Sequence, residues 1–208
     1  MNTIGYFGDS FCADKSKNSW CTILAEKLNC KVVNTGVVAS SIWTAILDFN
    51  RLKIKPTYSI FCWTDPYRIY NNSFFNLEHN IREMGHSDVT VNKKIQDAIE
   101  TYKIWISDND KDHVQYEYVL KYFDQKVLKP LQKSTMIYQC WSFKPFELVD
   151  QHQDIQLTAG KFDNISLYQI ANKKSFLDNF NVKKDPVYNH MSAEQNIEFA
   201  ERVYKILL

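Results

Sequence analysis

A serine hydroxyl that follows the first apolar run of the sequence is the first group that could carry out chemistry. Residues 3–7 have the composition of a buried strand, and Gly8-Asp9-Ser10 after them is typical of a tight turn of small residues. A serine is inert at its free pKa and becomes a nucleophile only when a base takes its proton. His190, just before the last helical stretch, could supply that base if the two ends of the chain meet. Because Gly-Asp-Ser is also a common turn sequence, other segments must decide between a nucleophile and an ordinary turn.

Further polar segments follow the next two apolar runs. Asn34-Thr35-Gly36 and Ala39-Ser40-Ser41 come after the second run, and Thr64-Asp65 comes after the third. In order along the chain, Gly8-Asp9-Ser10, these segments and His190 resemble the sequence blocks of the SGNH or GDSL hydrolase family. The resemblance implies a flavodoxin-like three-layer α/β/α sandwich with a mainly parallel sheet, and ester hydrolysis through an acyl-serine intermediate.

The resemblance also implies a role for each residue. Ser10 is the nucleophile, its own backbone N–H is the first donor to the oxyanion, and His190 is the base. Asp9 supports the turn. Ala39 stands where the family usually has glycine, but a backbone N–H donor does not require glycine, so Ala39 is the expected second donor.

Two other positions depart from the family pattern. Thr64 stands where the family supplies an asparagine amide to the oxyanion, and its hydroxyl is a donor on a shorter arm. The family has an aspartate three residues before the histidine, where this chain has Val187. The nearest upstream acid is Asp185, which could orient the imidazole of His190. A Ser-His dyad without Asp185 is the alternative.

Aromatic residues crowd the segment that should border the serine, and they offer flat apolar surfaces suited to sugar rings or acyl chains. Arg68 in the same segment could bind a carboxylate or phosphate on the substrate. We expect Trp63, Tyr67 and Arg68 to bind substrate, with the alternative that the aromatic residues belong to the core, which is the more common place for such a stripe. The aromatic set is Trp63, Tyr67, Tyr70, Phe74 and Phe75.

The elements that must position these groups alternate along the chain. Strand patterns at residues 3–7, 31–34 and 58–63 are separated by helical patterns at 19–28 and 40–49, which predicts a parallel sheet. The rhythm then changes, and helical patterns at about 91–106 and 111–129 predict a helical insertion at about 66–133. We expect one domain over residues 1–208, with later strands at 135–140 and 165–170.

The last helix has a clear start signal. Ser192-Ala193-Glu194-Gln195 is a capping box. The apolar positions that follow at helical spacing predict a buried stripe of Ile197, Ala200, Val203, Tyr204 and Leu207.

Composition excludes several other classes of protein. The 25 Lys and Arg nearly balance the 24 Asp and Glu, so no overall charge attracts nucleic acid or an anionic membrane. The five cysteines and five histidines show no metal-ligand spacing, and we predict no metal and no cofactor. No apolar run reaches the ~18 residues of a membrane span. Scattered cysteines and the absence of a signal-peptide pattern predict reduced thiols and a cytoplasmic location.

The sequence therefore predicts a serine esterase acting on a small-molecule or glycan ester, such as an O-acetyl group on a glycan. The second hypothesis is a catalytically weak or inactive protein of the same fold that binds a carbohydrate or a protein partner. A phosphate or nucleotide binder is disfavoured because no glycine-rich phosphate loop follows the first strand.

Overall fold

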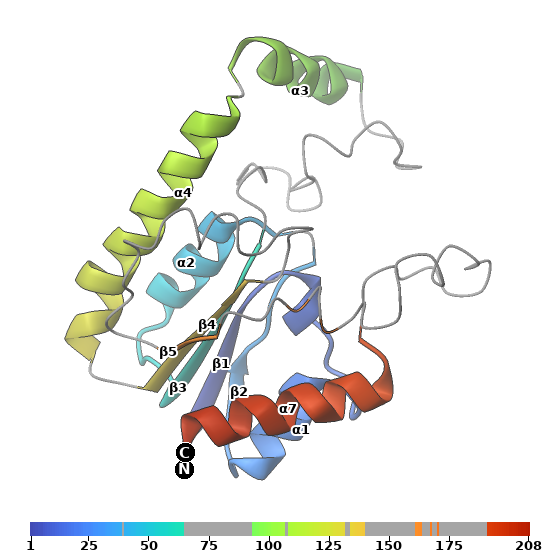
Figure 1. Cartoon of the computed structure of the whole chain (residues 1–208), viewed down its shortest axis with the longest axis vertical. Helices are drawn as coiled ribbons and strands as arrows, with labels where there is room; N and C mark the ends of the chain where they lie inside the picture. The colour runs from blue at the N-terminus through green and yellow to red at the C-terminus, as the bar shows by residue number, and fades with distance from the viewer. Residues whose placement is uncertain are drawn as a thin grey trace.

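The computed structural model describes most of the chain. The described residues are 1–38, 40–64, 93–106, 108–131, 134–139, 161–163, 167, 170 and 191–208. These residues form an α/β fold in which helices cover both faces of a parallel sheet (Figure 1).

The sheet has five strands in the order β2-β1-β3-β4-β5, and all neighbouring pairs are parallel. The first strand lies between the second and third, so the chain winds outward from β1 in both directions. In such doubly wound sheets, ligand sites form at the carboxyl ends of the strands, where the order reverses. The strands are β1 (Thr3–Gly8), β2 (Lys31–Asn34), β3 (Tyr58–Trp63), β4 (Ser134–Gln139) and β5 (Lys161–Asp163).

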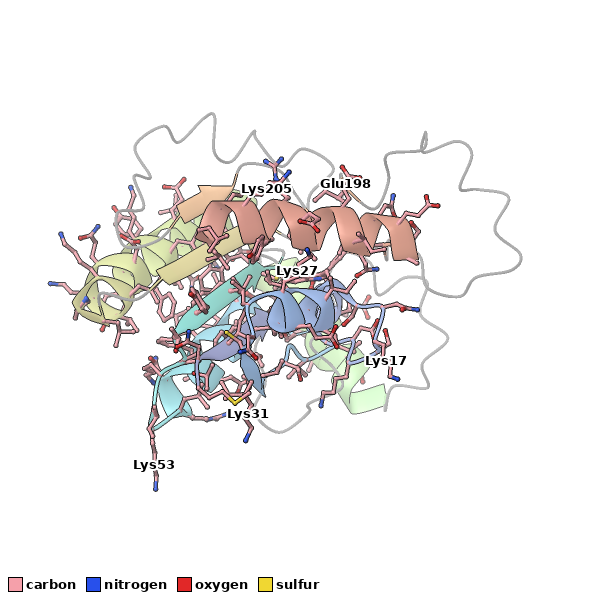
Figure 2. All side chains as sticks on the ribbon, turned by 90° about the horizontal axis from the view of Figure 1, so that it is seen from below. Lys17, Lys27, Lys31, Lys53, Glu198 and Lys205 are labelled. Carbon is pink, nitrogen blue, oxygen red and sulfur yellow. The ribbon has the colours of Figure 1, made fainter. Side chains whose placement is uncertain are left out.

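One face of the sheet is covered by α1 (Trp20–Lys27) and α7 (Ala193–Leu207), which lie side by side although they come from opposite ends of the chain (Figure 1). Trp20 of α1 packs edge-on against Phe199 of α7, with ring centroids 4.8 Å apart. At the surface, Lys27 forms an ion pair with Glu201 at 2.5 Å, and Figure 2 shows Lys27 between the two helices.

The other face is covered by α2 (Ile42–Arg51) and α4 (Asn109–Phe123), whose aromatic residues pack against the sheet. Phe123 of α4 lies edge-on to Phe61 of β3, with ring centroids 5.0 Å apart. The helix α3 (Lys93–Trp105) lies beyond the far end of α4, away from the sheet (Figure 1). The segment expected as an insertion therefore includes α4, the helix that completes this layer. Two short turns follow it, η2 (Asp124–Leu128) and η3 (Lys129–Leu131).

The prediction of a strand at residues 165–170 is wrong. The fifth strand is β5, which ends at Asp163, whereas Leu167 and Ile170 are helical and buried in the core beneath α1 and α7. Residues three apart lie on the same face of a helix, so this apolar pair fits a helix packed on the sheet.

The capping box at the start of α7 is confirmed. The Gln195 N–H donates to Ser192 Oγ at 3.3 Å, and the Ser192 N–H donates to Gln195 Oε1 at 2.7 Å. The buried stripe is rotated from the expected one, because Phe199 is buried and Ile197 is 52% exposed. Within the parts of the chain that the structure describes, no helix is long and apolar enough to cross a membrane.

Candidate active site

Ser10 begins a one-turn 3-10 helix, η1 (Ser10–Cys12), immediately after β1. The side chain of Asp9 is completely buried, and its Oδ1 accepts a hydrogen bond from the Phe11 N–H at 3.1 Å. The Cys12 N–H donates to the backbone oxygen of Asp9 at 3.1 Å. Asp9 therefore stabilises the turn from below, as expected, while Ser10 itself remains half-buried at the carboxyl end of β1.

The loop after β2, residues 35–41, is held against this turn and is called the β2 loop below. The carbonyl oxygen of Gly8 accepts hydrogen bonds from the Val37 N–H at 2.9 Å and from Ser40 Oγ at 2.8 Å. The Gly36 N–H donates to the carbonyl oxygen of Cys12 at 2.9 Å. These three bonds connect the β2 loop to the residues on both sides of Asp9-Ser10-Phe11, so the loop and the serine turn form one rigid corner.

Gly36 is required at this corner because a side chain would not fit. A Cβ at this position would lie 2.6 Å from the carbonyl oxygen of Asp9 and 2.8 Å from that of Gly8, and it would also collide with Cys12 Sγ. Such contacts with backbone atoms can be relieved only by moving the loop. The glycine therefore permits the close approach of the β2 loop to the serine turn.

Ser40 was not recognised from the sequence as distinct from its neighbour Ser41. Both residues are fully buried, but Ser41 Oγ caps α2 by accepting a hydrogen bond from the Thr44 N–H at 3.4 Å. Ser40 instead bonds the strand that carries the nucleophile candidate. No local signal separates the two serines, because the partner of Ser40 is 32 residues away.

Thr64 lies at the same edge of the sheet as Ser10. Gly8 is paired with Cys62 in the β1–β3 register, and Ser10 and Thr64 each lie two residues beyond that pair. The Thr64 side chain is 1% exposed, and its Oγ1 has no hydrogen-bond partner among the described residues. An unpaired buried hydroxyl is costly, so Thr64 has a donor available for a group that enters from this edge.

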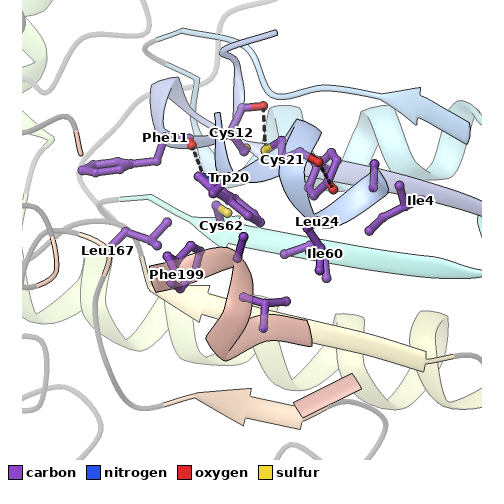
Figure 3. Close-up of a cluster of buried hydrophobic side chains, with 14 of the residues drawn as sticks. Ile4, Phe11, Cys12, Trp20, Cys21, Leu24, Ile60, Cys62, Leu167 and Phe199 are labelled. Carbon is purple, nitrogen blue, oxygen red and sulfur yellow. Dashed lines mark hydrogen bonds between the residues drawn. The ribbon is translucent and has the colours of Figure 1, made fainter. Parts of the chain in front are cut away.

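The far end of the chain is connected to the serine turn through Trp20. The Trp20 Nε1–H donates to the carbonyl oxygen of Phe11 at 2.7 Å, as Figure 3 shows, and the Trp20 backbone N–H donates to Asn196 Oδ1 at 2.8 Å. Asn196 Nδ2 in turn donates to the carbonyl oxygen of Met191 at 3.0 Å. A chain of three hydrogen bonds thus runs from the residue after Ser10 to the residue after His190.

Trp63 does not present a surface to a substrate, which corrects the expectation from the sequence. Its side chain is 1% exposed, stacks on Phe61 at 5.1 Å between ring centroids, and contacts Phe123 edge-on at 5.6 Å. Trp63 is the last residue of β3, and its ring points into the core under α2 and α4 rather than into the following loop. The other predicted site residues lie outside the described part of the chain, namely Ala39, Tyr67, Arg68, Asp185 and His190.

The Cys12 thiol, two residues after Ser10, is not activated. Burial raises the pKa of the Cys12 thiol well above its ordinary value, and a hydrogen bond with the Cys62 thiol raises it further. A neutral thiol is a weak nucleophile, so Ser10 rather than Cys12 is the candidate on this turn. Among the described residues, no three His, Cys, Asp or Glu side chains are grouped so that they could hold a metal ion.

Comparison with solved structures identifies a related fold. One match is a carbohydrate esterase whose active site displays divergent catalytic and non-catalytic binding functions, with a TM-score of 0.53 and 10% sequence identity. The match covers 99% of this chain but only 64% of that protein. Another match is a lipolytic protein of the G-D-S-L family from Desulfitobacterium hafniense DCB-2, with a TM-score of 0.47, 15% identity and full coverage of both chains. Neither the models of known families nor the curated proteins include a match to this sequence.

The match to the carbohydrate esterase confirms the expected resemblance at the level of the fold. The chain has an α/β fold with a parallel sheet flanked by helices, as that esterase does. Which chemistry this chain performs has to be argued from its own residues.

Proposed function

We propose that the protein is a serine ester hydrolase of the SGNH type, built on a flavodoxin-like three-layer sandwich. The observation that carries the proposal is the rigid corner at the carboxyl end of β1. There a half-buried serine hydroxyl follows a buried, hydrogen-bonded aspartate, and the β2 loop is joined to the same strand by two hydrogen bonds on Gly8. Preorganised backbone of this kind is what stabilisation of an oxyanion requires.

In the proposed reaction, Ser10 Oγ attacks the ester carbonyl while His190 takes the hydroxyl proton. The oxyanion accepts hydrogen bonds from the backbone N–H groups of Ser10 and Ala39 and from the Thr64 hydroxyl. The carbonyl re-forms as the C–O bond to the alcohol breaks, and His190 gives its proton to the leaving alcohol. Water then attacks the acyl-serine by the same route, releasing the acid and free Ser10. Asp185 would orient the imidazole.

The position of Met191 supports the role of His190. Met191 follows His190 directly in the sequence. Met191 is connected to Phe11 through Asn196 and Trp20, and its side chain packs against the same core as Phe11.

For the substrate, we propose a carboxylic ester on a carbohydrate, such as an O-acetyl group. The support is the shared fold with a carbohydrate esterase. Tyr67 and Arg68 follow closely after Thr64 in the sequence and remain the proposed substrate-binding residues.

The alternative is a protein that binds a carbohydrate or a protein partner with little or no hydrolysis. One observation favours it: Thr64 offers a short hydroxyl arm where the resembling family offers an amide. Loss of one preorganised donor costs about 10² to 10³ in kcat. The same site is therefore compatible with a weak esterase and with a protein that binds its ligand without hydrolysis.

Hydrolysis of 4-nitrophenyl acetate tests the proposal. The wild-type protein should release nitrophenol above the rate in buffer, and Ser10→Ala should abolish that release. The melting temperature of Ser10→Ala should stay near the wild-type value, because the half-buried hydroxyl contributes little to packing. Equal rates for a folded Ser10→Ala variant and the wild type would contradict the assignment of Ser10.

A further inference from the structure

A cavity lies at the β2 edge of the sheet, next to the start of the β2 loop. It has a volume of about 520 Å³ and is bounded by the segment after η1, by α1 and by the edge strand β2. This volume falls in the range of small-molecule sites, about 300 to 1,000 Å³. Ser10 and Thr64, the two proposed catalytic residues that the structure describes, do not line it.

The cavity is connected to the proposed active site through one segment. Asn34 and Thr35 line the cavity, and Thr35 is the first residue of the β2 loop. Asn34 Nδ2 donates to the carbonyl oxygen of Tyr6 at 2.7 Å, which holds this wall of the cavity against β1. A molecule bound in the cavity would therefore lie next to the loop that flanks Ser10.

Among the lining residues that the structure describes, one side chain is negative and one is positive. Both carboxylate oxygens of Asp14 are held in place, because the Ser16 N–H donates to Oδ1 at 2.7 Å and Ser16 Oγ donates to Oδ2 at 2.8 Å. Lys15 is exposed and forms no ion pair with any residue that the structure describes. With Thr35, the described lining offers an acceptor, a donor and a hydroxyl and carries no net charge, which suits a neutral ligand rich in hydroxyl groups.

The apolar lining comes from two neighbouring valines of the edge strand. Val32 and Val33 are 37% and 38% exposed, and both border the cavity. The pairing of β2 with β1 is irregular here, since Ile4 is opposite Val32 whereas Gly5 is opposite Asn34. The two valines give the ligand an apolar surface beside the polar groups, which fits a sugar ring with its C–H and hydroxyl faces.

We propose that this cavity binds a neutral sugar unit of the glycan whose ester lies at Ser10. This inference rests on the proposed function, because that function places the ester of the glycan at Ser10. Binding of a sugar unit in the cavity does not itself require hydrolysis. Asp14 and Lys15 hydrogen-bond the ring hydroxyls, and the two valines contact the apolar ring face.

Binding is tested by titrating the ¹⁵N-labelled full chain with cellobiose, xylobiose and chitobiose, and with glucuronate as a charged comparison. At least one neutral disaccharide should shift the amide signals of Val32, Val33 and Thr35. Lys15→Ala should weaken binding by about tenfold, as expected for loss of a hydrogen bond to a charged group. Lys17→Ala is the matched control, since Lys17 is also exposed, as Figure 2 shows, but is not among the residues that line the cavity. Absence of shifts with all three disaccharides, or shifts with glucuronate alone, would overturn the proposal.

A kinetic comparison separates this proposal from the proposed function. Lys15→Ala and Val33→Phe, the latter filling part of the cavity, should raise KM for an acetylated oligosaccharide and leave 4-nitrophenyl acetate hydrolysis unchanged. An unchanged KM for both variants would overturn the cavity assignment while the esterase stands. If the wild type hydrolyses neither ester, the proposed function fails, and the disaccharide titration still decides whether the cavity binds sugar.

Discussion

Ser40 and Ser41 are adjacent serines whose hydroxyl groups have different roles. Ser41 caps a helix, whereas Ser40 holds the carbonyl oxygen of Gly8 and so fixes the β2 loop relative to Ser10. Since Ser40 is fully buried, it can act on the reaction only by positioning other groups.

Ser40→Ala should lower kcat for 4-nitrophenyl acetate by about tenfold to a hundredfold, because small displacements of catalytic groups have effects of this size. KM should change little, since Ser40 does not contact the substrate. Ser41→Ala is the control: it should lower the free energy of unfolding by about 0.5 to 2 kcal/mol, as for other helix caps, with a smaller effect on kcat. Steady-state kinetics and denaturant unfolding of both variants check this. Equal losses of kcat in the two variants would refute a special role for Ser40.

Thr64 offers a test in which stability and activity should move in opposite directions. Its Oγ1 is buried without a hydrogen-bond partner among the described residues, so the folded protein bears the cost of removing this hydroxyl from water. Thr64→Val replaces it with a methyl group of similar shape and should raise the free energy of unfolding by about 1 kcal/mol.

The same substitution should lower kcat, because the proposed donor to the oxyanion is lost. Thr64→Asn supplies a longer amide donor and should raise kcat by about tenfold if it folds. Activity that is unaffected in both folded variants would show that Thr64 does not face the oxyanion.

At the scale of secondary structure, the site depends on how closely the β2 loop approaches the turn after β1. Gly36→Ala should force the loop away from the backbone oxygens of Asp9 and Gly8, because its Cβ would lie 2.6 Å and 2.8 Å from them. We expect a loss of about 1 to 3 kcal/mol in the free energy of unfolding, typical of overpacking, and a loss of activity larger than that of Ser40→Ala.

Val38→Ala is the matched control for Gly36→Ala, because Val38 lies in the same loop and is 65% exposed. It should leave both the free energy of unfolding and kcat near the wild-type values. A folded Gly36→Ala variant with full activity would contradict the requirement for close approach.

At the scale of the whole molecule, α1 and α7 from opposite ends of the chain pack side by side, and only part of this arrangement could be predicted from the sequence. The patterns at residues 31–34 and 58–63 predict β2 and β3, and β1 extends only one residue beyond the predicted end. β1 and β3 are buried on both faces because helices cover both sides of the sheet, and this signal is strong and local, whereas β2 is an exposed edge strand.

Predictions failed where distant contacts decide the local structure. The sequence predicts a helix that reaches residue 129, but α4 ends at Phe123. A π-helical turn follows, in which Asp124 and Leu128 are buried. For the site, the residue types and their order are evident from the sequence, but the hydrogen bonds of Ser40 and Trp20 are not. The Trp20–Asn196 bond joins residues 176 positions apart, and such a pair arises only when the sheet and both helices have packed.

The central claim, that Ser10 is the activated nucleophile, is tested most directly by a fluorophosphonate probe followed by mass mapping of the labelled peptide. The account predicts that the phosphonyl group is attached to Ser10 and that Ser10→Ala is not labelled. Iodoacetamide added beforehand at pH 7 should not block labelling, because burial raises the pKa of Cys12 and keeps its thiol neutral. A folded wild-type protein that is not labelled, or that is labelled on a residue other than Ser10, would contradict the account.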